Sequence, residues 1–116
     1  MRILRFEELE SWKKSQQLAK LLYKELASCR DFSFRDQIQR AGVSISNNIA
    51  EGFERQTNKE LKQFLYIAKG SCGEFRSMLY LAKDLSYISE ERFTESYNLS
   101  IEISKLLSAF IKKVGE

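Results

Sequence analysis

Apolar residues recur at every third or fourth position through most of this chain, which is the spacing of one buried face of an α-helix. No segment shows the strict alternation of apolar and polar residues that is typical of a half-buried strand. Four helices are therefore expected, over residues 7–28, 34–55, 58–86 and 89–114. The pattern is clearest in the second helix, at Phe34, Ile38, Ala41, Ile45, Ile49 and Phe53.

Capping signals place the connections between these helices. Thr57 with Glu60 forms a capping box before the third helix, and Ser89 precedes the fourth. Ser33 with Asp36 resembles a weaker box near the start of the second. Short connections make neighbouring helices fold back antiparallel, so we expect a single all-α domain over the whole chain, an antiparallel up-down-up-down four-helix bundle.

The expected inward faces follow from the same helical spacing. They consist of Leu9, Trp12, Ala19, Leu22, Tyr23 and Leu26 in the first helix, Leu61, Leu65, Ala68, Cys72, Phe75, Leu79 and Ala82 in the third, and Phe93, Tyr97, Ile101, Ser104, Leu107, Phe110, Ile111 and Val114 in the fourth.

In the third helix the apolar arc is wider than one inward face requires. The additional residues are Phe64, Ile67, Met78 and Leu81. Either this helix occupies a central position in the bundle, or the extra residues form an interface between copies of the chain. We expect the second, and therefore a homo-oligomer, most simply a dimer or a closed ring.

Composition excludes several classes of function. The chain has no histidine, which removes the usual general base and the nucleophiles that histidine activates. No glycine-rich phosphate loop follows a strand, and the acidic residues do not fall at metal-binding spacings. Cys29 and Cys72 lie far apart and are expected to be free thiols. We therefore expect no enzymatic activity, no cofactor and no metal.

No apolar run approaches the length needed to cross a bilayer, about 18 residues. The first ten residues turn acidic too early for a signal peptide. We therefore expect a cytoplasmic protein without membrane association.

One side of the third helix combines cations with tyrosines at helical spacing. Its members are Lys59, Lys62, Tyr66, Lys69, Gly73, Arg76, Tyr80, Lys83 and Tyr87. Cations interleaved with tyrosines suit the phosphates and bases of RNA or DNA, so all of them except Gly73 and Tyr87 are candidate nucleic-acid contacts. The alternative is a solvated flank whose lysines pair with acids on a neighbouring helix. The small net charge, +3, does not separate the two.

The second helix has a polar stripe beside its apolar one. The stripe consists of Gln37, Arg40, Ser44, Asn47, Asn48, Glu51 and Arg55. Serine and asparagine have low helix propensity, so their presence requires a reason. Three remain open: a hydrogen-bond network between helices, a contact between subunits, or a ligand or nucleic-acid site.

Several motifs resemble the bacterial four-helix-bundle proteins that are encoded in intervening sequences of 23S rRNA. The matching residues are Phe6, Leu9 and Trp12 at the start, Arg40, Ala41, Ser44, Ile45 and the run NIAEGF at 48–53 in the second helix, and Lys59, Phe64, Gly70, Ser71 and Glu74 in the third. The chain departs from the family pattern at Ser46, where proline is common.

The resemblance implies a bundle that assembles as a ring, with a pentamer as the expected form. It also implies a relation to the accessory variability proteins of diversity-generating retroelements, which are basic pentamers that bind reverse transcriptase and nucleic acid. We therefore expect a non-enzymatic oligomer that binds RNA or DNA through the basic face of its third helix. The alternative is a scaffold or adaptor for a protein partner, such as a reverse transcriptase or a ribosomal protein, with no nucleic-acid affinity of its own.

Overall fold

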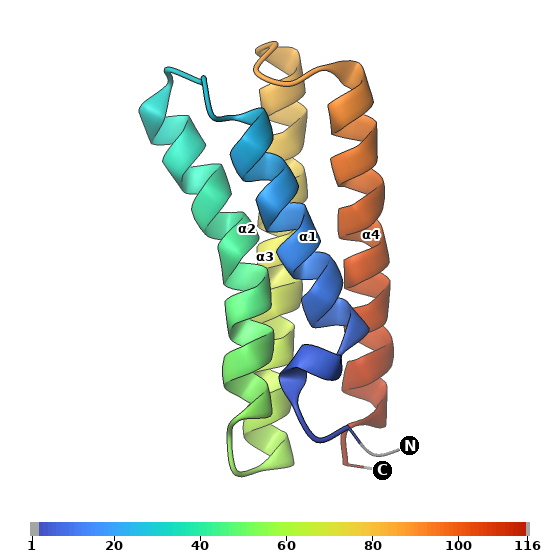
Figure 1. The fold of residues 1–116 in the computed structure, drawn as a ribbon. Helices are drawn as coiled ribbons and strands as arrows, with labels where there is room; N and C mark the ends of the chain where they lie inside the picture. The colour runs from blue at the N-terminus through green and yellow to red at the C-terminus, as the bar shows by residue number, and fades with distance from the viewer. Residues whose placement is uncertain (1–2, 116) are drawn as a thin grey trace.

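Four antiparallel helices form one bundle in the computed structural model, which describes residues 3–115 (Figure 1). They are α1 (Glu10–Glu25), α2 (Phe32–Phe53), α3 (Asn58–Asp84) and α4 (Glu90–Lys113), and the 3-10 helix η1 (Phe6–Glu8) precedes them. The first and last described residues, Ile3 and Gly115, lie at the same end of the bundle as the α2–α3 connection (Figure 1). The all-α four-helix bundle expected from the sequence is confirmed.

Helices α3 and α4 begin where their capping residues predict. The side chain of Thr57 accepts a hydrogen bond from the backbone N–H of Glu60 at 3.1 Å. The side chain of Ser89 accepts one from the backbone N–H of Arg92, also at 3.1 Å. Each bond satisfies one backbone donor that has no partner inside its helix, which is why these residue types mark helix starts.

The start of α2 differs from the sequence prediction. The N-cap is Asp31, whose Oδ1 accepts from the backbone N–H of Phe34 at 3.2 Å. Its Oδ2 accepts from the Tyr87 hydroxyl at 2.6 Å, which joins the α1–α2 connection to the α3–α4 connection. The box expected at Ser33 and Asp36 is therefore wrong, because a tertiary contact holds Asp31 at the helix start.

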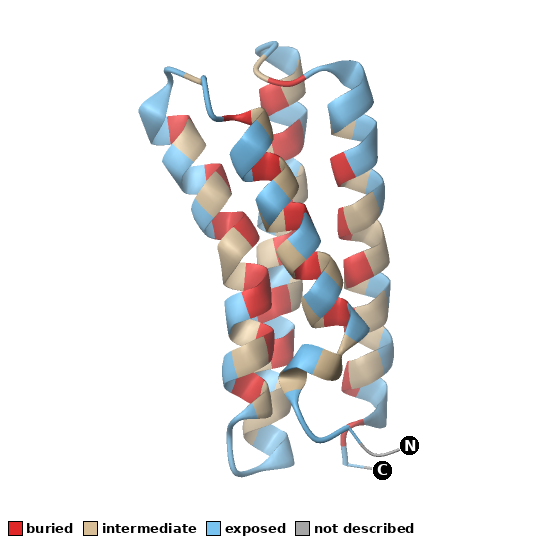
Figure 2. Ribbon diagram, in the orientation of Figure 1, coloured by how far each residue is buried: buried red, intermediate tan, exposed pale blue. Residues whose placement is uncertain are grey.

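The core lies along the bundle axis, between the inward faces of all four helices (Figure 2). In α3 the predicted seam is confirmed from Leu65 to Ala82, and Leu61 is partly buried. In α2 the predicted apolar residues are buried from Phe34 to Ile49, and Phe53 is partly buried.

The predicted inward face of α1 is partly wrong. Leu18 is fully buried, whereas Tyr23, which we expected inside, is 49% exposed. Relative to that prediction, α1 is rotated about its own axis, so that Ser11 and Ser15 are buried. Ser15 donates its hydroxyl to the carbonyl oxygen of Ser11 at 2.6 Å, so its polar atom is satisfied within α1 and the small side chain packs inside.

Helix α4 shows the same kind of rotation. Its buried residues are Ser96, Ser100, Ile103, Leu107 and Ile111. Ser100 donates to the carbonyl oxygen of Tyr97 at 2.8 Å and so behaves as a small core residue. The expected inward residues Phe93, Tyr97, Ile101, Ser104 and Phe110 are instead only partly buried.

Helices α2 and α3 are in tight contact near their connection. A Cβ atom added to Gly52 would lie 2.6 Å from the Cβ of Phe64 and 3.3 Å from a methyl carbon of Leu61. No side chain fits in that space without moving α3. Gly52 therefore sets the separation of the two helices that bear most of the motifs described above.

Candidate nucleic-acid interface

The four cations at seven-residue intervals on α3 lie on the flank that faces α4. We call Lys62, Lys69, Arg76 and Lys83 the basic flank. Tyr80, from the same stripe, packs against α4, with its ring centroid 5.2 Å from that of Phe93 and 5.8 Å from that of Tyr97. All four side chains of the basic flank are partly buried, so their aliphatic parts lie on the bundle while their charges reach its surface.

None of these four cations, nor Lys59 in the first turn of α3, lies within 4 Å of a carboxylate among residues 3–115. Cations elsewhere do pair across helices. Lys14 of α1 lies 2.9 Å from Glu102 of α4, and Arg92 of α4 lies 3.3 Å from Glu25 of α1. Glu102 of α4 is thus turned toward α1, whereas Phe93 and Tyr97 of α4 pack against Tyr80 of α3.

Tyr80, Phe93 and Tyr97 form an aromatic cluster between α3 and α4. The rings of Phe93 and Tyr97 stack at 5.6 Å, and Tyr80 packs against both. Lys83 places its ammonium 4.4 Å from the Phe93 ring centroid and 5.6 Å from that of Tyr80. Sequence reasoning assigned Phe93 and Tyr97 to the core and missed this cluster, although their four-residue spacing places them on one side of α4.

The three tyrosines of the stripe have different surroundings. Tyr66 is 59% exposed, and Tyr80 is 48% exposed beside its aromatic neighbours. Tyr87 donates its hydroxyl to Asp31, which raises the pKa of Tyr87. Tyr66 and Tyr80 therefore present free surface, whereas Tyr87 has a structural role in joining the two connections.

The polar stripe of α2 divides into two parts, of which the first is a hydrogen-bond network with α3. The hydroxyls of Ser44 and Ser71 lie 3.0 Å apart. Asn48 donates its amide to the Ser44 carbonyl oxygen at 2.8 Å and to its hydroxyl at 2.9 Å. At the end of α2, Arg55 pairs with Glu51 at 2.8 Å.

The second part of the stripe faces away from the bundle. Gln37, Arg40 and Asn47 are exposed. Arg40 lies between two surface hollows, one of about 550 Å³ that Tyr23 and Asn47 also line, and one of about 250 Å³ toward Glu74 of α3. The structure therefore assigns Ser44 and Asn48 to contacts within the bundle and leaves these three residues for a contact outside it.

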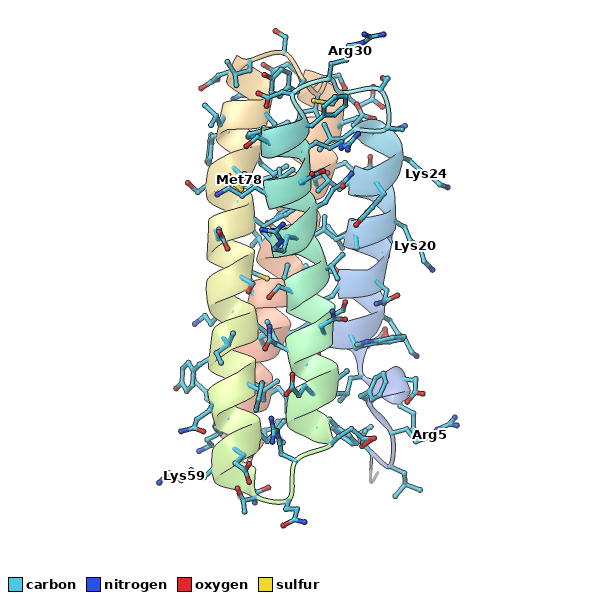
Figure 3. All side chains as sticks on the ribbon, turned by 90° about the vertical axis from the view of Figure 1, so that its left-hand side faces the viewer. Arg5, Lys20, Lys24, Arg30, Lys59 and Met78 are labelled. Carbon is cyan, nitrogen blue, oxygen red and sulfur yellow. The ribbon has the colours of Figure 1, made fainter. Side chains whose placement is uncertain are left out.

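The four extra apolar residues of α3 also separate into two pairs. Ile67 is 51% exposed and Leu81 is 49% exposed. Phe64 is covered by the guanidinium of Arg55, 4.7 Å from its ring centroid, and Met78 packs against the core. Figure 3 shows Met78 on the edge of α3 that lies next to α2. The bundle covers much of one pair and leaves the other at its surface.

The described part of the chain has neither a metal-binding cluster nor a membrane-spanning helix. Among residues 3–115, no group of three or more cysteine or acidic side chains is placed to hold a metal ion. No helix there is long and apolar enough to cross a membrane. Cys29 and Cys72 are free, as expected.

Comparison with known proteins relates the whole fold to one family. The family model of the 23S rRNA-intervening sequence protein matches residues 7–109. A crystal structure from Bacteroides thetaiotaomicron, described as a protein with unknown function from the S23 ribosomal protein family, is 33% identical in sequence. The match covers 89% of this chain and 99% of that one, with a TM-score of 0.82. A comparison with proteins of curated function found no similar sequence.

Proposed function

We propose that this chain, which belongs to the family of 23S rRNA-intervening sequence proteins, is a homo-oligomeric helical bundle. In this proposal the bundle binds RNA or DNA through the basic flank of α3, without catalysing a reaction. The absence of histidine supports a binding role over an enzymatic one.

The observation behind this proposal is that the cations of α3 have no acidic partners among residues 3–115. Paired surface charges attract a polyanion weakly, because their fields largely cancel. Unpaired cations in a row along one helix attract phosphates, and each phosphate contact releases condensed counterions. The α3–α4 side is therefore the surface of the bundle that best suits a nucleic-acid backbone.

The outer face of α3 supports the homo-oligomer. Ile67 and Leu81 each leave about half of their surface exposed, and Gly70 lies between them. A Cβ atom added to Gly70 would meet nothing within 4 Å, so the isolated chain does not require glycine there. A glycine inside an exposed helix costs about 1 kcal/mol relative to alanine. A second copy packed closely against this turn would explain why the residue is small. A ring such as a pentamer would supply that second copy.

Charge reversal on the basic flank tests nucleic-acid binding. We expect Lys69→Glu with Arg76→Glu to weaken binding of labelled RNA and DNA, measured by fluorescence anisotropy at several salt concentrations. Losing two phosphate contacts should reduce the slope of log K against log salt by about 1.4 for single strands. The matched control reverses Lys20 and Lys24, which project from α1 (Figure 3) and have no ion pair among residues 3–115. This control variant changes the net charge by the same amount, at a site away from α3.

Equal loss of binding in the two double variants would contradict the assignment to α3, because net charge alone would then explain it. Circular dichroism must show both variants folded. Sedimentation equilibrium of the wild type in the same buffers tests the oligomer. A monomer at micromolar concentration would overturn the homo-oligomer and leave only the weaker binding of a single flank.

The alternative function is a protein scaffold or adaptor. It is favoured by the exposed residues Arg40 and Asn47, which line the hollow of about 550 Å³ between α1 and α2, and by Gln37, which lines the hollow of about 250 Å³ toward α3. A scaffold of this kind predicts no binding of RNA or DNA even at low salt. The anisotropy measurement therefore separates the two functions.

A further inference from the structure

We infer that the α3–α4 side of the bundle binds single-stranded nucleic acid, with one base stacked on Tyr80 and the adjacent phosphate held by Arg76. This inference rests on the proposed nucleic-acid function and specifies its ligand. It follows from the aromatic cluster, from the surroundings of Arg76, and from the distribution of charge on α4.

Tyr80 is held in place on three sides and still exposes about half of its surface. Phe93 and Tyr97 pack against its ring, and the Lys83 ammonium lies 5.6 Å from its centroid. An aromatic side chain that is already ordered loses little conformational entropy when a base stacks on it. Tyr66 is more exposed and has no aromatic neighbour within the described residues, so it is the poorer platform.

Arg76 has a hydrogen-bond donor without a partner. Its Nη1 atom is buried and forms no hydrogen bond with any group in residues 3–115. Its Nη2 lies 4.0 Å from the position that a Cβ of Gly73 would occupy, so the guanidinium is turned back along α3 toward Lys69. A withdrawn and unpaired guanidinium donor is unfavourable. Phosphate oxygens are the acceptors that a guanidinium binds best, often with two parallel hydrogen bonds.

Arg76 and Tyr80 are four residues apart, so their side chains are neighbours on the same side of α3, about 6 Å apart at their Cβ atoms. That separation suits the phosphate and the base of one nucleotide once the Arg76 guanidinium, which is turned back toward Lys69 in the free protein, swings out toward Tyr80. The side of α4 opposite them continues from Tyr97 through Ile101 to Ser104 at helical steps, and these residues include no carboxylate. The carboxylates nearest this side by helical spacing, Asp84 of α3 and Glu90 of α4, lie beyond Tyr80 toward the α3–α4 connection, so a phosphate at Arg76 approaches a stretch of surface without a carboxylate.

Stacking explains why the ligand is a single strand. In a duplex the bases are stacked on one another and their faces are not available to a surface tyrosine. Lysine and arginine contacts to phosphates alone do not distinguish the two forms. A partly exposed aromatic residue next to a phosphate-binding cation is the combination found in proteins that bind single strands.

The test compares a labelled oligouridylate with a duplex of the same length, using wild type and Tyr80→Leu. Leucine keeps apolar contact with Phe93 and Tyr97 but removes the stacking ring. We expect the affinity for the single strand to fall by about 5- to 100-fold and the affinity for the duplex to stay unchanged. Tyr23→Leu is the matched control, because Tyr23 is 49% exposed on α1, away from the basic flank. It should change neither affinity.

Tyr80→Trp retains an aromatic ring and should keep or increase single-strand binding. It replaces the leucine variant as the test of stacking if the leucine variant does not fold. Unchanged single-strand binding in Tyr80→Leu, or equal losses for single strand and duplex, would overturn the inference while leaving the proposed function in place. No binding of either probe by the wild type would overturn the proposed function itself.

Discussion

Gly52→Ala is expected to force α2 and α3 apart and to destabilise the bundle. The added Cβ would lie 2.6 Å from the Cβ of Phe64, well inside the usual separation of two carbon atoms, about 3.5–4.0 Å. The Phe64 Cβ is bonded directly to the backbone of α3, so no change of rotamer moves it away. The helices themselves must separate by about 1 Å, which affects packing along their whole contact.

The expected magnitude is a balance of two effects. Overpacking of this kind costs about 1–3 kcal/mol. Alanine in place of glycine returns at most about 1 kcal/mol of helix propensity, and less at Gly52 because it lies in the last turn of α2. The net loss in free energy of unfolding should be about 1–2 kcal/mol. Gly42→Ala in the same helix is the matched control, because its Cβ would lie 3.5 Å from the Phe75 ring, an ordinary contact. That variant should gain about 0.5–1 kcal/mol.

Urea unfolding followed by circular dichroism at one protein concentration measures both variants. The two should differ by about 1.5–3 kcal/mol in free energy of unfolding with unchanged m values. If Gly52→Ala proves as stable as Gly42→Ala, the close approach at Phe64 does not constrain the sequence and the reasoning is refuted.

Two further predictions concern titratable groups. Burial raises the pKa of the Cys72 thiol to about 11, so only Cys29 should react quickly with a thiol reagent at neutral pH. Rapid reaction of both thiols in the folded protein would contradict the burial of Cys72. The Tyr87 hydroxyl and the Phe34 N–H lower the pKa of Asp31 below its ordinary value of 3.8. The ionised carboxylate therefore stabilises the fold above that value, and this contribution is lost as pH falls through the lower folded-state pKa. Asp31→Asn should flatten the pH dependence of urea unfolding in that acidic range, and an unaltered profile would show that Asp31 contributes nothing there.

The sequence predicted best the features that depend on neighbours within one helix. The caps at Thr57 and Ser89 and the seam of α3 from Leu65 to Ala82 required only local spacing, and the structure confirms them. The inward faces of α1 and α4 were partly wrong because buried serines look polar in a sequence. Ser15 satisfies its hydroxyl on its own helix, which a count of apolar positions does not detect.

The sequence by itself determined the row of cations on the third helix, because a seven-residue repeat places side chains on one flank whatever surrounds them. Only the tertiary structure decided what that flank faces. Glu102 turns toward Lys14 of α1, and Phe93 and Tyr97 turn toward Tyr80 of α3. Helical spacing fixes the order of side chains around an axis, but the rotation of each helix about that axis depends on contacts with residues far away in the chain.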